Sequence, residues 1–128
     1  MMRKLKNAIS WFEIPVTNVE RAKKFYETIL DIQMTEIQLD TDFVLVLFPV
    51  EEGSVGGALC RNENFYKPAQ TGTILYLNAN PDLQNILEKV EPEGGKIIKP
   101  KTHISDVFGF MAFIEDTEGN RLALHSAG

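Results

Sequence analysis

The alternation of apolar and polar positions predicts the same unit twice along this chain. Residues 11–30 read as a short strand followed by an amphipathic helix, and residues 73–90 repeat that order at matching spacing. A tract rich in strand-forming residues and glycine follows each helix. The pattern therefore predicts two strand–helix–strand–strand–strand units. Two curved half-sheets of this kind can enclose a cavity, where proteins commonly bind small molecules.

Within the first unit, alternation separates two faces of a strand over residues 9–16, because successive strand side chains point to opposite faces. Ile14 and Val16 share the apolar face, which we expect to pack on the helix. Trp11 and Glu13 then point away from the helix, into whatever the sheet encloses. A capping-box pattern at 17–20 predicts the start of that helix.

The second helix is expected to begin at Asn80-Pro81-Asp82, with Asn80 as its cap and Pro81 at its first position, and to end before Pro92. Turn-forming residues at 62–72 predict a linker between the units; its Phe65 and Tyr66 could pack over a cavity mouth. His103 is expected in a loop. The remaining strands are predicted at 32–39, 43–48, 56–61, 73–79, 96–99, 109–114 and 120–125.

Composition narrows the function classes. The chain has 128 residues, of which 44% are hydrophobic, and a net charge of −5. An acidic chain argues against a nucleic-acid partner, and no apolar run reaches the roughly 18 residues that span a membrane. No export-signal pattern follows the first residues, so a cytoplasmic location is expected. Cys60, the single cysteine, excludes an intrachain disulfide and is expected to be buried.

Three stretches resemble a known family. They are VTNVERAKKFYETIL at 16–30, TGTILYL at 71–77 and FGFMAFIEDTEGNRLALHS at 108–126. Together they resemble the vicinal oxygen chelate superfamily, which includes glyoxalase I, fosfomycin-resistance enzymes, extradiol dioxygenases and bleomycin-resistance proteins, and in particular its glyoxalase-related members without assigned reactions. The resemblance implies an α+β domain over residues 1–128, with modules at about 8–62 and 72–126. It also implies two tandem βαβββ modules that form a cupped mixed sheet, and a homodimer.

The resemblance also indicates which residues would have to bind a metal ion. In metal-using members, four side chains from the first and last strands of the modules bind one divalent ion. Carried over, the first, third and fourth positions fall on Trp11, Thr73 and Ala123, and the second falls near Gly57 or Ala58. Most of these residues lack a ligand atom, and a neutral Thr is a poor ligand. We therefore expect no metal or other cofactor, and neither glyoxalase I nor dioxygenase activity.

Two titratable groups remain on the strand faces that are expected to line the cup. Glu13 lies two residues after Trp11, and His125 two residues after Ala123, so strand periodicity gives each the direction of its neighbour. A carboxylate and an imidazole could act as acid and base in a metal-independent lyase or isomerase. Alternatively, Glu13 bonds the backbone or Arg121, and His125 is solvated near the chain end. A noncanonical metal site formed by Glu13, His125 and a further carboxylate is another alternative.

The expected partner is a small organic molecule bound in the cup. A second hypothesis is a non-catalytic binding protein, as bleomycin-resistance proteins are, in which aromatic rings stack on the ligand. Either way, the residues predicted to contact the ligand are Trp11, Phe48, Thr73, Phe108, Met111 and Ala123.

Overall fold

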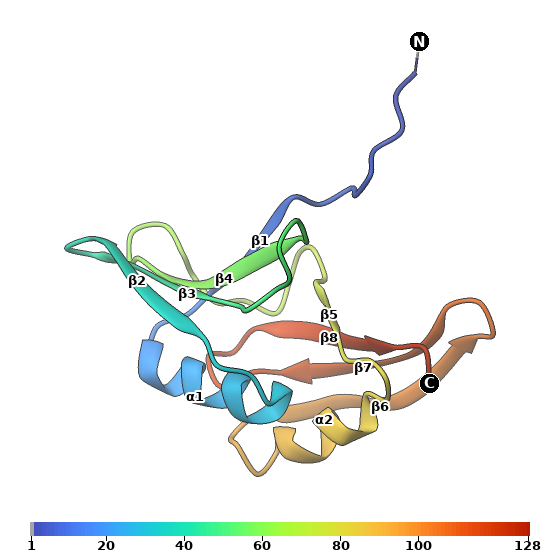
Figure 1. The fold of residues 1–128 in the computed structure, drawn as a ribbon. Coiled ribbons are helices and arrows are strands. Elements are labelled where there is room, and N and C mark those ends of the chain that lie inside the picture. The colour runs from blue at the N-terminus through green and yellow to red at the C-terminus, as the bar shows by residue number, and fades with distance from the viewer. Residues whose placement is uncertain (1) are drawn as a thin grey trace.

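The computed structural model describes residues 2–128 and contains the predicted unit twice (Figure 1). In the first sheet the strands lie in the order β1-β4-β3-β2, and in the second in the order β5-β8-β7-β6. Each sheet is mixed, because its first and last strands in sequence pair in parallel while the other pairs are antiparallel. The predicted α+β class and tandem modules are thus confirmed. The elements are β1 Trp11–Pro15, α1 Val19–Leu30, β2 Thr35–Asp40, β3 Phe43–Leu47, β4 Gly56–Arg61, β5 Tyr76–Asn78, α2 Gln84–Val90, β6 Lys96–Ser105, β7 Gly109–Glu115 and β8 Arg121–Ser126.

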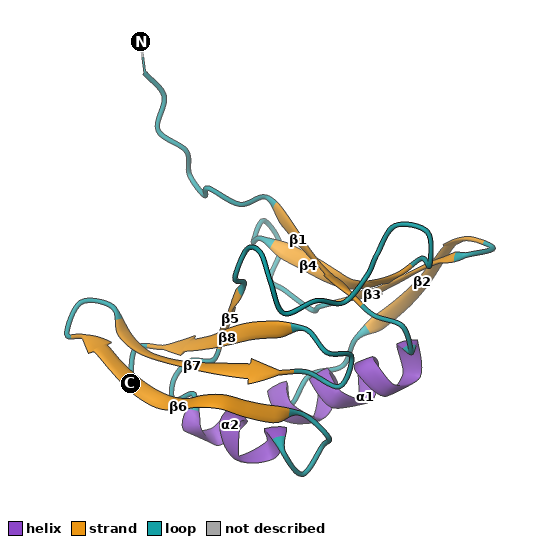
Figure 2. Cartoon of the chain, turned by 180° about the vertical axis from the view of Figure 1, so that it is seen from behind, coloured by secondary structure: helices purple, strands orange, loops and turns teal. Residues whose placement is uncertain are grey.

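One hydrophobic core joins the two modules. It contains Ile14 of β1 and Phe25 of α1 together with Leu87 of α2 and Leu124 of β8. Figure 1 shows α1 beneath the first sheet, and the view from behind shows both helices on one side of the second sheet (Figure 2). The helices therefore cover the inner faces of both sheets, and the opposite faces, called the outer faces below, are left without a helix.

The outer faces carry the residues that strand alternation assigns to them. Trp11 is 45% exposed, and Tyr76, which lies opposite Ala123 in the β5–β8 ladder, is 47% exposed. Ile14 and Leu124, at alternate positions on the same strands, are buried in the core. Trp11 and Ala123 thus face away from the helices, as the alternation predicts.

The start of α1 differs from the predicted capping box. The cap is Asn18, whose side-chain oxygen accepts a hydrogen bond from the Arg21 backbone N–H at 3.0 Å. Thr17 does not cap the helix, because its backbone N–H and its hydroxyl both donate to Glu118. A carboxylate from the β7–β8 turn has therefore taken the place expected of the helix's own Glu20.

The second module departs further from its predicted bounds. Helix α2 begins at Gln84, later than predicted, and has no side-chain cap at Leu83; Asp82 instead accepts from the Gln84 backbone N–H in the preceding turn. Strand β5 is shorter than predicted, and β6 is much longer, so His103 lies in a strand rather than a loop. Irregular pairing between β6 and β7 breaks the alternation that would have revealed β6 in the sequence.

No helix between residues 2 and 128 is long and apolar enough to cross a membrane. Cys60 is buried in β4, as expected.

Candidate functional site

Glu13 is the centre of the polar cluster on the outer face of the first sheet. The register of β1 with β4 places it opposite Ala58, a small residue that leaves room beside the carboxylate. The Tyr66 hydroxyl donates to Glu13 Oε1 at 2.7 Å, and the Trp11 indole N–H donates a longer bond of 3.4 Å to Oε2. Two donors from different segments thus hold one carboxylate in place.

Cys60 lies near this carboxylate but is a weak nucleophile. Burial, followed by the charge of Glu13, raises the pKa of the Cys60 thiol to about 12. The hydrogen bond to Glu13, followed by burial, raises the pKa of Tyr66 as well. Both groups are therefore protonated at neutral pH. Because the thiolate is the reactive form of cysteine, the cluster offers Glu13 as its proton acceptor and Tyr66 as a donor.

A cavity of about 190 Å³ lies beside Glu13, between β1, the linker and the start of β8. Glu13 and Pro15 line it from β1, and Arg121 lines it from β8. Thr73, which precedes strand β5, is also part of the wall. Its full lining is residues 13–15 and 120–122 together with Lys67, Ala69, Thr71, Thr73 and Leu75.

The basic side of this cavity is incompletely hydrogen-bonded. Arg121 Nη2 donates to the Gly72 carbonyl at 3.0 Å, which holds the guanidinium against the linker. Its Nε is buried and has no hydrogen-bond partner among residues 2–128. Sequence reasoning considered Arg121 only as a partner of Glu13 and did not single out Lys67. The detectable signal was that Arg121 lies two residues before Ala123, on the same face of β8.

His125 lies on the outer face of the second sheet and does not line the Glu13 cavity. Its Nε2 donates to the Phe108 carbonyl at 2.5 Å. In the neutral imidazole, that bond leaves Nδ1 as the acceptor. Within one chain, then, the structure does not bring the two predicted acid–base groups into one cavity.

The predicted ligand-contacting residues separate into two groups. Met111 and Ala123 are buried on the outer-face side of the second sheet, where Met111 lies opposite His125. Phe108 is 65% exposed in the turn before β7. Phe48 belongs to the inner side instead, because its ring packs 5.2 Å from that of Phe12 and 5.7 Å from that of Tyr26. Phe48 was predicted to contact the ligand, but its ring packs against the hydrophobic core instead.

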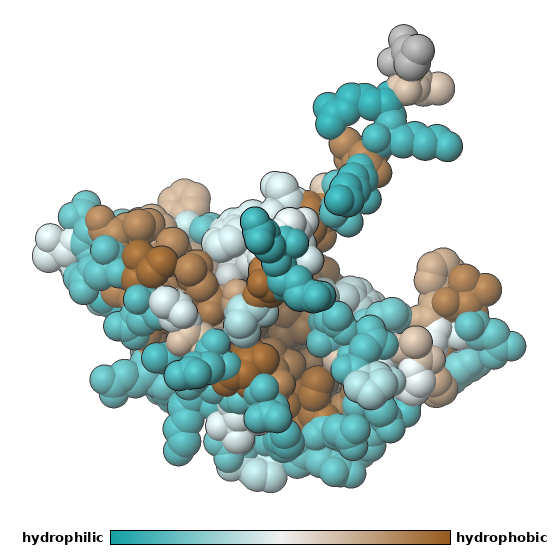
Figure 3. All heavy atoms as spheres, in the orientation of Figure 1, coloured by the Kyte–Doolittle hydropathy of each residue, from teal (hydrophilic) through white to brown (hydrophobic). Residues whose placement is uncertain are grey.

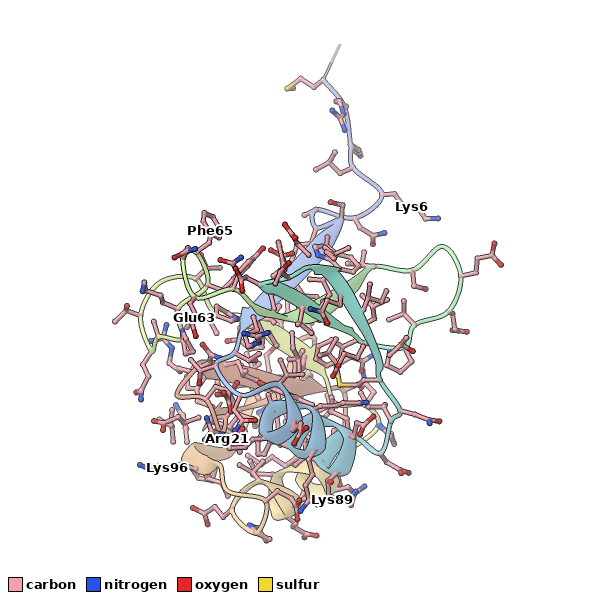
Figure 4. All side chains as sticks on the ribbon, turned by 90° about the vertical axis from the view of Figure 1, so that its left-hand side faces the viewer. Lys6, Arg21, Glu63, Phe65, Lys89 and Lys96 are labelled. Carbon is pink, nitrogen blue, oxygen red and sulfur yellow. The ribbon has the colours of Figure 1, made fainter. Side chains whose placement is uncertain are left out.

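Phe65, the other aromatic residue of the linker, is more exposed than Tyr66. Phe65 is 79% exposed and contacts the ring of Tyr66 at 5.1 Å between centroids. Figure 4 shows Phe65 and Glu63 at the outer edge of the molecule, on the linker loop. Of the two linker aromatics, Tyr66 therefore reaches the site and Phe65 lies outside it.

The donor set does not fit the family's metal. Trp11 and Ala123 occupy two of the expected ligand positions and have no coordinating atom suited to a divalent ion. Between residues 2 and 128, no three His, Cys, Asp or Glu side chains are grouped so that they could hold an ion. No reaction step through a metal is therefore derived for this chain.

Comparison with known proteins agrees with this architecture. The family profile described as Glyoxalase/Bleomycin resistance protein/Dioxygenase superfamily matches residues 8–124. A search of curated protein sequences found no significant match.

Solved structures share the fold at low sequence identity. A superfamily member from Sphaerobacter thermophilus is 23% identical, with a TM-score of 0.68, and the match covers 94% of this chain and 97% of that one. A hypothetical protein from S. aureus is 20% identical, with a TM-score of 0.66 and coverage of 98% and 95%. A mutant of glyoxalase I from Zea mays gives a TM-score of 0.71 at 20% identity, but the match covers 91% of this chain and only 44% of that one. The profile match over nearly the whole length shows that this chain belongs to the Glyoxalase/Bleomycin resistance protein/Dioxygenase superfamily.

Proposed function

We propose that this protein binds a small organic molecule beside Glu13 and acts on it as a metal-independent lyase or isomerase. The observation that carries the proposal is the position of the Glu13 carboxylate at a cavity, fixed by the Tyr66 hydroxyl at 2.7 Å. A fixed carboxylate next to a bound ligand can remove a proton beside a carbonyl group. Such proton removal is the first step of many isomerisations and eliminations.

Tyr66 acts in this proposal as a positioning residue and a donor. Its hydroxyl is protonated at neutral pH, since its pKa is raised, and it donates to one oxygen of Glu13. Among residues 2–128, the other oxygen accepts only the long bond from Trp11. That oxygen is therefore the one available to a ligand proton.

Deuterium exchange in D₂O tests the proposal. Small 2-oxo acids and aldehydes, starting with pyruvate and 2-oxobutyrate, are incubated with the protein, and C–H loss beside the carbonyl is followed by proton NMR. We expect exchange with at least one probe and a fall of about 100-fold or more in Glu13→Gln, because general base catalysis contributes roughly that much.

Glu88→Gln is the matched control, since Glu88 is exposed on α2, away from the cavity. Exchange in Glu13→Gln at the parent rate would refute the role of Glu13. A probe that binds the parent without any exchange would contradict the enzyme and support the non-catalytic binding protein.

We also propose that two copies pair through their outer sheet faces. Exposed apolar residues support this: besides Trp11 and Tyr76, β2 carries Ile37 and Leu39, and Figure 3 shows hydrophobic residues gathered over the β2–β3 end of the first sheet. Burying such residues against a second copy removes apolar area from water. If the first sheet of one copy faces the second sheet of the other, Glu13 and His125 line the same space.

A further inference from the structure

The cavity beside Glu13 has an excess of positive charge. Lys67 and Arg121 line it, against the single carboxylate of Glu13. Arg121 forms no ion pair within the described part of the chain. Glu115, its neighbour across the β7–β8 ladder, is already bonded to the Gln70 side-chain amide. The guanidinium therefore has no anionic partner of its own.

The linker holds the Arg121 side chain at the wall of the cavity. Its Nη2 is held by the Gly72 carbonyl at 3.0 Å, and the backbone N–H of Arg121 donates to Ala69 at 3.3 Å. The linker thus fixes the side chain, and its positive charge lies at the cavity wall without an ion-pair partner among residues 2–128. A carboxylate is the acceptor that guanidinium geometry matches best.

The opposite wall offers acceptors and hydroxyl groups. Within the described part of the chain, one Glu13 oxygen accepts only the long bond from Trp11, and Thr71 and Thr73 line the same cavity. The volume of about 190 Å³ is small for a ligand pocket, since those of drug-sized ligands run from roughly 300 Å³ upward. It is nonetheless several times the roughly 30 Å³ that a water molecule occupies in the liquid. The space suits a molecule of a few carbon atoms.

We propose that this cavity selects small carboxylates that carry a hydroxyl group next to the carboxylate carbon. The carboxylate is held by Arg121 and Lys67, and the hydroxyl donates to Glu13. This inference rests on the proposed function and names the substrate class of the same site. It predicts that both ends of the ligand are recognised, with charge at one end and hydrogen-bond donation at the other.

Three probes of similar size separate the contribution of the carboxylate from that of the hydroxyl group. Lactate has both groups, propionate has only the carboxylate, and propane-1,2-diol has only the hydroxyl groups. Each is titrated into ¹⁵N-labelled full-length protein at constant ionic strength and followed by amide chemical shifts. We expect lactate to bind most tightly, propionate at least threefold more weakly, and the diol without saturation. The shifts should centre on residues 69–73 and 120–122.

Variants test the basic residues separately. We expect Arg121→Gln to weaken lactate binding at least tenfold, and Lys67→Gln, at an exposed residue, at least threefold. Arg3→Gln is the control, because it removes the same charge at an exposed site outside this cavity and should change the dissociation constant less than twofold. Thermal melting establishes that each variant is folded; if Arg121→Gln does not fold, Lys67→Gln and the shift map of the parent decide.

The outcomes distinguish this inference from the proposed function. Equal binding of lactate and the diol, lactate binding unchanged in Arg121→Gln, or no binding of lactate by the parent would each overturn the carboxylate selection. Exchange that depends on Glu13 could still be observed with another probe, and the proposed function would then stand alone. Conversely, lactate binding that needs Arg121, without any exchange that needs Glu13, would support this inference and refute the enzyme.

Discussion

Glu118 is the residue that ties the two modules together. From the turn between β7 and β8 it accepts hydrogen bonds from the backbone N–H groups of Thr17 and Asn18, at 2.9 and 2.8 Å, and from Arg21 Nε at 2.7 Å. Its side chain is fully buried. Burial alone would raise the pKa of Glu118, but these donors outweigh it and lower the pKa from 4.5 to about 2. The anion therefore also stabilises the positive end of α1.

Because the folded protein lowers the pKa of Glu118, its contribution to stability is complete above pH 4.5 and is lost as the pH falls towards 2. We predict that Glu118→Gln lowers the free energy of unfolding by about 2 kcal/mol at pH 7. The variant should also lose part of the parent's decline in stability between pH 4.5 and 2. Urea unfolding at several pH values measures both effects.

The control for this substitution is Glu88→Gln, an exposed carboxylate on α2 with no side-chain partner in the described structure. It should leave the free energy of unfolding within about 0.5 kcal/mol of the parent. Parallel pH profiles for the parent and Glu118→Gln would show that Glu118 does not carry the predicted linkage.

The two adjacent glycines of β4 have different neighbours. A side-chain carbon at Gly57 would lie 2.4 Å from ring atoms of Phe12, whose ring also packs on Phe48. At Gly56 the nearest atom, from Val50, would be 3.3 Å away, and Trp11 follows at 3.4 Å. Strand β4 pairs in unbroken register with β1, and the glycine at 57 permits close approach of the Phe12 ring.

We predict that Gly57→Ala destabilises the protein by about 1–3 kcal/mol, because a methyl group overfills a packed site between strand and ring. Gly56→Ala, one residue away, should change the free energy of unfolding by less than about 1 kcal/mol, since alanine also restricts the unfolded chain. Chemical denaturation of the two variants side by side measures the difference. Equal effects would mean that Phe12 moves aside without cost.

Among the helices and strands, the sequence was most informative where strand pairing is regular. The bounds of β4 were predicted correctly, because turn residues precede and follow a short apolar run, and β1 and β7 were predicted to within two residues. Strand β6 was predicted far too short, since its pairing with β7 is interrupted three times. The start of α2 was missed because Asp82 acts from a turn and not as a cap.

The two sheets share one core but leave their outer faces uncovered. Trp11 on β1 and Tyr76 on β5 lie on edge strands of their sheets, and both side chains are nearly half exposed on the outer faces. We predict a dimer, twice 14.4 kDa, by sedimentation equilibrium. Trp11→Arg should weaken dimerisation at least tenfold, because it places a charge in the proposed apolar interface.

Thr28→Arg serves as the matched control, because Thr28 is exposed on α1, which lies on the opposite side of the first sheet from Trp11. It should leave the dimer intact. A monomeric parent at concentrations of about 100 μM, or equal weakening by both substitutions, would contradict pairing through the outer faces.

By itself, the sequence determined the repeated βαβββ unit, the family and the direction of Trp11, Glu13, Ala123 and His125, because strand periodicity and turn residues act locally. Only the tertiary structure decided which of these groups meet. Glu13 is joined by Tyr66 across 53 positions of sequence and shares its cavity with Arg121, whereas His125 lies on the other sheet. Such contacts depend on how the linker and the two sheets pack, and packing between distant segments leaves no periodic signal in the chain.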